Sequence, residues 1–97
     1  QGEWPQAELQ LHKALEVRET SLPKNDWRTA HTKVILGETL TAMKEYERAE
    51  QLLKQGSQTL QDTQEAPDSA TEQSRSALAN LYRQWDKTGK LDQLESN

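Results

Sequence analysis

The dipeptide Leu36-Gly37 constrains the fold more than any other part of the chain, because apolar and small residues follow it at helical distances. Leu40 lies one helical turn after Leu36, and a second run begins beyond the short polar turn Lys44-Glu45. The members of that second run are Tyr46, Ala49, Leu53 and Gly56. Two apolar stripes at helical spacing, separated by a short polar turn, predict an antiparallel helix pair. We expect the small residue Gly37 to face Ala49 and Gly56, which would let the two backbones approach closely.

The remainder of the chain shows the same helical spacing, with polar or proline-containing breaks between the runs. No segment alternates with the period of two that a strand requires, so the predicted fold class is all-α. A fifth helix would begin at Leu91 and stop at the chain end. The four helices expected before it cover about residues 4–20, 26–44, 46–60 and 69–85.

Capping residues mark several of these boundaries. Asn25 or Asp26 is placed to cap the second helix. Ser69 and Glu72 have the spacing of a capping box, which predicts the start of the fourth helix. Gly89 suits the left-handed position that closes a helix, so we expect the fourth helix to end near it.

Composition narrows the class of protein. Apolar residues make up 32% of the 97-residue chain, which is little for one central core but enough for thin layers between paired helices. The net charge of −4, with scattered basic residues, makes nucleic acid an unfavourable partner. No apolar run approaches the roughly 18 residues that span a membrane. The lack of cysteine is compatible with a cytoplasmic protein, and the start at Gln1 suggests a piece of a longer chain.

The sequence also contains an internal repeat. In a third unit we expect an offset of 45 residues, which pairs Leu81 with Leu36. Tyr82 then takes the place of Gly37, and the added bulk predicts an atypical, splayed terminal helix pair. In the first two units, the residues that align at an offset of 42 are Trp4 with Tyr46, Ala7 with Ala49, Glu8 with Glu50, Leu11 with Leu53 and Ala14 with Gly56.

These positions resemble the signature of the tetratricopeptide repeat, a helix-turn-helix unit. The period near 42 is similar to the longer variant found in kinesin light chains. Residues 14–19, followed by Leu22-Pro23 and Asp26-Trp27, resemble the segment that joins two such repeats. A similar pattern occurs in the C-terminal regions of bacterial serine/threonine kinases, and residues 81–85 resemble the way those regions end.

The resemblance implies a right-handed α-solenoid, a tetratricopeptide-like superhelix of about five helices. Residues 1–97 would form a single fragment of it. Residues 1–22 would be the second helix of one repeat, residues 26–62 a complete repeat, and residues 68–97 an atypical terminal repeat.

The resemblance also implies a protein–protein interaction module that binds a peptide or a partner helix on its concave face. In the family, the exposed side of each repeat's first helix lines that face, and helical phase selects the residues here. A merely solvated helix surface is the alternative explanation for all of them. The selected residues are His31, Val34, Ile35, Glu38, Thr41, Asn80, Arg83 and Lys87.

Catalytic and metal-binding patterns are weak. His12 has no second histidine at helical spacing, whereas His31 and Glu38 share one helix face. Two residues do not complete a tetrahedral metal site, so a structural or peptide-contact role is favoured. We find no nucleophile elbow and no glycine-rich phosphate loop in the sequence. We therefore expect no enzymatic activity, no metal and no cofactor.

A second functional hypothesis is a structural spacer or self-association element of a larger protein, possibly linked to a kinase. The first helix would then expose a stripe from Leu11 to Leu15, and copies of the chain would pair through such end faces. This hypothesis predicts a homodimer without a ligand of its own.

Overall fold

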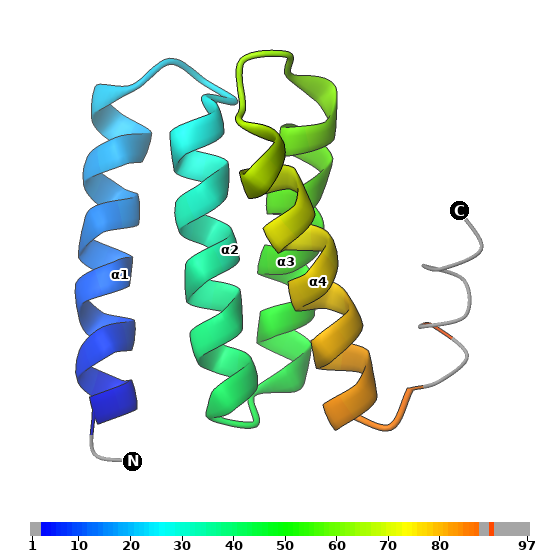
Figure 1. Ribbon diagram of the computed structural model, residues 1–97. Coiled ribbons are helices and arrows are strands. Elements are labelled where there is room, and N and C mark those ends of the chain that lie inside the picture. Colours follow the sequence, from blue (N-terminus) through cyan, green and yellow to red (C-terminus); the bar gives the residue numbers. More distant parts are fainter. Residues whose placement is uncertain (1–2, 88–89, 91–97) are drawn as a thin grey trace.

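The computed structural model describes residues 3–87 and residue 90, and it confirms the all-helical prediction over these residues. The helices run alternately up and down and are joined by short connections (Figure 1). The fifth helix expected from Leu91 lies outside the described residues. The four described helices are α1 (Glu3–Ser21), α2 (Trp27–Ala42), α3 (Tyr46–Asp62) and α4 (Asp68–Gln84).

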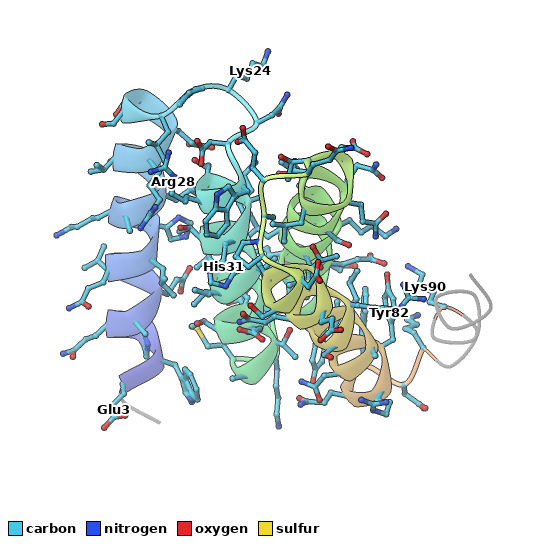
Figure 2. All side chains as sticks on the ribbon, turned by 45° about the horizontal axis from the view of Figure 1, so that its top comes forward. Glu3, Lys24, Arg28, His31, Tyr82 and Lys90 are labelled. Atoms are coloured by element: carbon cyan, nitrogen blue, oxygen red, sulfur yellow. The ribbon has the colours of Figure 1, made fainter. Side chains whose placement is uncertain are left out.

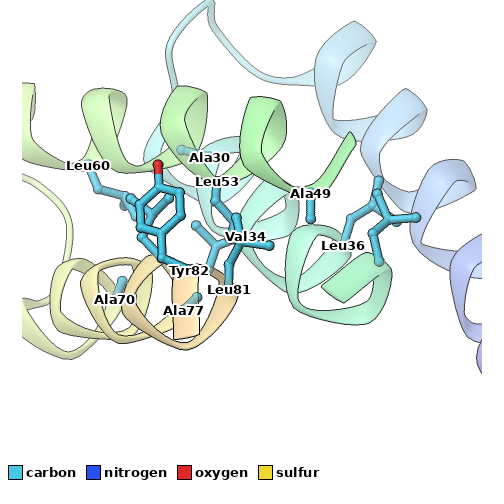
Figure 3. Packing of buried hydrophobic residues seen from close by; sticks show 12 residues of the cluster. Ala30, Val34, Leu36, Ala49, Leu53, Leu60, Ala70, Ala77, Leu81 and Tyr82 are labelled. Carbon is cyan, nitrogen blue, oxygen red and sulfur yellow. The ribbon is translucent and has the colours of Figure 1, made fainter. Parts of the chain in front are cut away.

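Helix α2 is central, since it packs against α1, α3 and α4, and its contact with α3 is the most extensive. The core lies where α2, α3 and α4 meet (Figure 3). Helix α1 contributes no buried residue to it. Leu11 and Leu15 are nevertheless partly buried against the core, so the exposed stripe expected there is not present. The core residues are Ala30, Val34, Leu36, Leu40, Ala49, Leu53, Leu60, Ala70, Ala77, Leu78, Leu81 and Tyr82.

Both ends of α2 are closed by local hydrogen bonds. Asp26 caps the start, as one of the two predicted alternatives, because its carboxylate accepts from the backbone N–H of Arg28 at 2.9 Å. At the other end Lys44 adopts a left-handed conformation with φ 65°. The Lys44 N–H donates to the Thr41 carbonyl, and the next N–H donates to Leu40. This pattern is a Schellman motif, and it turns the chain sharply into α3.

Helix α4 ends in the same motif. Asp86 is left-handed with φ 62°, its N–H donates to the Arg83 carbonyl, and the next N–H donates to Tyr82. Asp86 is therefore the equivalent of Lys44, at an offset of 42 residues. This corrects the expected offset of 45 for the third unit, and it places the end of α4 before Gly89, which lies outside the described residues.

The corrected offset removes the reason to expect a splayed terminal pair. Tyr82 now corresponds to Leu40, and both side chains are buried. Ala79, another small residue, takes the place of Gly37. The bulk of Tyr82 therefore does not fall at the close helix crossing.

Gly37 and Gly56 mark the close approach of α2 and α3, although Gly37 does not face Gly56 as expected. A Cβ added at Gly37 would lie 2.6 Å from Cγ of Leu53. A Cβ added at Gly56 would lie 2.8 Å from the carbonyl oxygen of Ala30. Gly37 therefore leaves room for the Leu53 side chain of α3, and Gly56 leaves room for the Ala30 carbonyl of α2.

The predicted capping box of α4 is wrong. The helix begins at Asp68, with Pro67 as its N-cap and no side-chain cap. The Pro67 carbonyl accepts from the N–H of Ala70 at 3.0 Å, so Ser69 already lies inside the first turn. Proline fixes its own φ near the value required here, which explains why the helix starts one residue after it.

Candidate functional site

Two predicted site residues of α2, His31 and Glu38, meet α4 at one surface, which we call the α2–α4 surface. Its centre is the Gln73 side chain of α4, which bonds to two residues of α2. His31 Nε2 lies 2.9 Å from the Gln73 carbonyl oxygen. The Gln73 amide nitrogen donates to Glu38 at 3.1 Å. Figure 2 shows His31 on α2 at the side next to α4.

Gln73 was missed by the sequence analysis because the third unit was aligned three residues out of register. His31 and Gln73 stand 42 residues apart, so they are equivalent positions of two successive units. At the true offset, helical phase would have selected Gln73. A three-residue error is close to one helical turn, so it preserved the face of α4 but displaced the positions along it.

Two predicted residues do not belong to this surface. Val34 is 0% exposed and lies in the core, where one of its methyl groups would be 2.9 Å from a Cβ at Gly56. Thr41 is 2% exposed, and its hydroxyl donates to the Gly37 carbonyl at 2.9 Å. Both side chains are buried by the packing around α2, which the helical phase of a single helix does not reveal.

The other predicted residues are accessible. Ile35 is half-buried, whereas Asn80, Arg83 and Lys87 are exposed along α4 and just beyond its end. The Asn80 carbonyl oxygen accepts from Gln84 at 3.1 Å. The α2–α4 surface therefore includes the apolar side chain of Ile35 and the hydrogen-bonded amide of Gln73. The positive charges of Arg83 and Lys87 lie further along α4 and just beyond its end.

Paired charges connect α1 with α3, away from this surface. Glu8 of α1 accepts from Arg48 at 2.8 Å and lies 3.4 Å from His12. The hydrogen bond from Arg48 holds the pKa of Glu8 below its ordinary value, and the nearby positive charges act in the same direction.

The same arrangement recurs 42 residues later. Glu50 of α3 lies 2.8 Å from the ammonium of Lys90 and 3.6 Å from that of Lys54. These residues stand at the positions of Glu8, Arg48 and His12 in the preceding unit. The ion pairs thus repeat with the helices, which supports the 42-residue offset independently of the Schellman motifs.

Tyr82 adds a hydrogen bond to the second of these clusters. Its hydroxyl donates to the Glu50 carboxylate at 2.9 Å, and Figure 2 shows Tyr82 next to Lys90. Burial raises the pKa of Tyr82, and the neighbouring carboxylate raises it further. Burial also opposes ionisation of Glu50, but the hydrogen bonds from Lys90 and Tyr82 outweigh it and leave the pKa of Glu50 lowered.

The three tryptophans have different environments. Trp27 is half-buried beside His31, with ring centroids 6.3 Å apart. Trp85 stacks on Tyr46 with centroids 5.8 Å apart, and the Lys87 ammonium lies 5.3 Å from its ring. Trp4 is 42% exposed, whereas Tyr46, the residue with which it aligns, is half-buried.

Potential metal-ligating side chains do not cluster in the described part of the chain. Within residues 3–87 and 90, no group of three or more histidine, cysteine, aspartate or glutamate side chains could hold a metal ion. The Gln73 amide between His31 and Glu38 has no acid–base capacity at ordinary pH. No described helix is long and apolar enough to cross a membrane.

Comparison with protein families gives one match. Residues 29–65 match the model described as a tetratricopeptide repeat. This range contains α2 without its first two residues, the turn after it, and the whole of α3. No curated protein and no solved structure matches the chain.

Proposed function

We propose, from the tetratricopeptide repeat match over residues 29–65, that this chain is a non-enzymatic module that binds a peptide or partner helix on the α2–α4 surface. Repeats of this family generally mediate protein–protein interactions and are not catalytic. In the family's solenoid this surface corresponds to the concave face. The bonds from Gln73 to His31 and Glu38 carry the proposal.

Those bonds support binding because they fix side chains from two successive units before a partner arrives. A preorganised surface loses less conformational entropy when it binds. Arg83 and Lys87 provide positive charge further along α4 and just beyond its end, and arginine is enriched among the residues that dominate binding energy. The side chains of the surface match a partner that carries both an apolar group and an acidic group.

The test is a selection of binding peptides followed by titration of the best binder. Arg83→Ala should weaken that binding about fivefold or more, the loss expected for a residue that contributes over 1 kcal/mol. Gln73→Ala should also weaken it, because the two helices lose their link. Lys13→Ala on α1 is the matched control, since it removes an exposed positive charge far from the surface and should leave binding unchanged. A saturated selection that yields no binder would contradict the proposal.

A second candidate function is a structural spacer or self-association element of a larger, kinase-linked bacterial protein in the cytoplasm. The observation in its favour is that all three large apolar side chains exposed among the described residues lie on α1. Trp4 is 42%, Leu9 57% and Val17 60% exposed. Among the four described helices α1 packs against α2, and its three exposed apolar side chains are available to another copy of the chain.

A further inference from the structure

The two bonds of the Gln73 side chain determine which nitrogen of His31 carries a proton. The ionised carboxylate of Glu38 only accepts hydrogen bonds, so the amide nitrogen of Gln73 must face it, at 3.1 Å. The amide oxygen of Gln73 therefore faces His31. His31 Nε2, at 2.9 Å from this oxygen, must then carry a proton and donate it. In the neutral imidazole the other nitrogen, Nδ1, is left as an acceptor.

Nδ1 of His31 is both unused and accessible. The ring forms its hydrogen bond through Nε2, and Nδ1 has no partner in the part of the chain that the structure describes. Over the same residues, the hydroxyl of Thr29 is the one buried side-chain nitrogen or oxygen group without a partner. Nδ1 of the half-buried His31 is therefore open to solvent. The α2–α4 surface thus presents an acceptor whose position Gln73 fixes.

The negative charge of Glu38 has no matching cation. Glu38 is half-buried, and among the described residues its side chain bonds to the uncharged amide of Gln73. A carboxylate that loses water without gaining a cation is held at a cost in free energy, so a cation from outside the chain would bind there favourably. The residues one turn away from Glu38 on α2 are all uncharged: Val34, Ile35, Thr41 and Ala42.

Other charged groups around this centre are engaged elsewhere or exposed. Arg28, one turn before His31, donates to the Asp26 carboxylate at 3.0 Å, and Lys33 donates to Gln55 of α3 at 3.3 Å. Two residues of opposite charge beside Gln73 on α4 are exposed. The charged residues that flank the centre are Arg28 and Lys33 on α2, Arg18 on α1, and Glu72 and Arg75 on α4.

We propose that the partner bound on the α2–α4 surface places a lysine or arginine side chain at this centre, where it donates to Nδ1 of His31 and to the Glu38 carboxylate. This inference rests on the proposed function and adds the chemistry of the partner. A cationic head with several N–H groups suits two acceptors held by one amide. Because α2 and α4 run in the same direction (Figure 1), the acidic group matched by Arg83 and Lys87 would lie further along the partner.

The first test needs no partner and uses ¹⁵N NMR of the histidine rings in their neutral form. His31 should carry its proton on Nε2 and none on Nδ1. That proton should exchange more slowly than the ring proton of His12, the exposed second histidine, because it is bonded to Gln73. A proton on Nδ1 of neutral His31 would overturn this inference, whether or not the surface binds a peptide.

The second test uses the peptides selected for the proposed function. We expect the binders to share a lysine or arginine, and its replacement by norleucine should weaken binding about tenfold or more. Glu38→Gln should weaken the original peptide similarly but should barely affect the norleucine peptide, because both changes remove the same contact. Glu72→Gln is the matched control, since it makes the same change of charge at an exposed position of α4 and should leave affinity nearly unchanged.

The pH dependence of binding gives a separate readout. Protonation of His31 removes the Nδ1 acceptor and adds a positive charge, so the affinity should fall as the pH is lowered from about 8 to about 5. His31→Asn should remove most of this fall, whereas His12→Asn should leave it intact.

The outcomes separate this inference from the proposed function. Binders without a basic residue, or losses from norleucine and Glu38→Gln that simply add, would overturn the inference and leave the proposed function standing. A saturated selection that yields no binder would contradict the proposed function and the inference together. The norleucine peptide is measured on the wild type, so its result does not depend on how well any variant folds.

Discussion

The close crossing of α2 and α3 allows a sharp prediction for Gly37→Ala. Alanine is more favourable than glycine inside a helix by about 1 kcal/mol, so an isolated helix would gain stability. In the folded protein the new Cβ would lie 2.6 Å from Cγ and 2.7 Å from Cδ2 of Leu53. Leu53 is 0% exposed, so it cannot relieve this overlap by turning into solvent without leaving the core.

Inserting a methyl group into a packed core costs about 1–3 kcal/mol. Except at the low end of this range, the cost exceeds the roughly 1 kcal/mol that alanine gains over glycine in a helix. Because the predicted contact is shorter than any ordinary Cβ contact, we expect the upper part of that range and a net loss of about 1–2 kcal/mol. For a domain of this size, each kcal/mol lowers the melting temperature by about 4–8 °C.

A second substitution separates the overlap from other causes. Leu53→Ala alone should cost about 2–5 kcal/mol, because it leaves a cavity. In the double variant the alanine at position 37 occupies part of that cavity. The two losses should therefore fall short of their sum by about 1 kcal/mol or more.

The assay is urea unfolding followed by circular dichroism, in sucrose if the double variant is too unstable without it. An unchanged dependence on urea concentration would show that the same surface is exposed in all variants. Additive losses, or a Gly37→Ala variant more stable than the wild type, would refute the proposed helix contact.

Three further predictions follow from other parts of the structure. Tyr82→Phe should lower the free energy of unfolding by about 1 kcal/mol at neutral pH, because a hydrogen bond to the partly exposed Glu50 carboxylate is lost; an unchanged urea midpoint would contradict this. The pKa of Glu50 is lowered from 4.5, so its stabilising contribution is present above that pH and is lost as the pH falls through the folded-state pKa. Glu50→Gln should therefore reduce the fall of the melting temperature between neutral and acidic pH. If α1 mediates pairing, light scattering should show a mass that rises with protein concentration. The Leu9→Lys, Val17→Lys double variant should have the monomer mass of about 11.1 kDa at every concentration. A constant mass near that value in the wild type would exclude self-association.

The helices were predictable from sequence because they depend on local patterns. Apolar spacing over α2 and α3 is strong, and the Asp26 cap and the turn at Lys44 fall at its boundaries. The start of α4 was less predictable, since Ser69 and Glu72 fit a capping box but Pro67 already fixes the backbone one residue before the helix. The capping-box spacing and the proline predict different first residues for α4, and the fixed φ of the proline determined where the helix begins.

The site was only partly predictable, because burial depends on the neighbours of a helix and not on its own phase. Val34 and Thr41 lie on the expected side of α2 by phase, yet both are buried in the folded chain. The orphaned hydroxyl of Thr29 gave no sequence signal at all. Thr29 and Thr32 are the same residue type on the same helix. Only the three-dimensional contacts show that the Thr32 hydroxyl has a hydrogen-bond partner, whereas the Thr29 hydroxyl has none among the described residues.

The register of the third unit shows how repetition can correct such an error. An offset of 45 aligned apolar residues well, because a shift of three residues keeps roughly the same face of a helix. Groups that must meet a specific partner do not tolerate that shift. Lys90 reaches Glu50 as Arg48 reaches Glu8, both at 2.8 Å, and Asp86 adopts the left-handed conformation of Lys44. Charged pairs and left-handed positions therefore fix the period of a helical repeat more sharply than its apolar residues do.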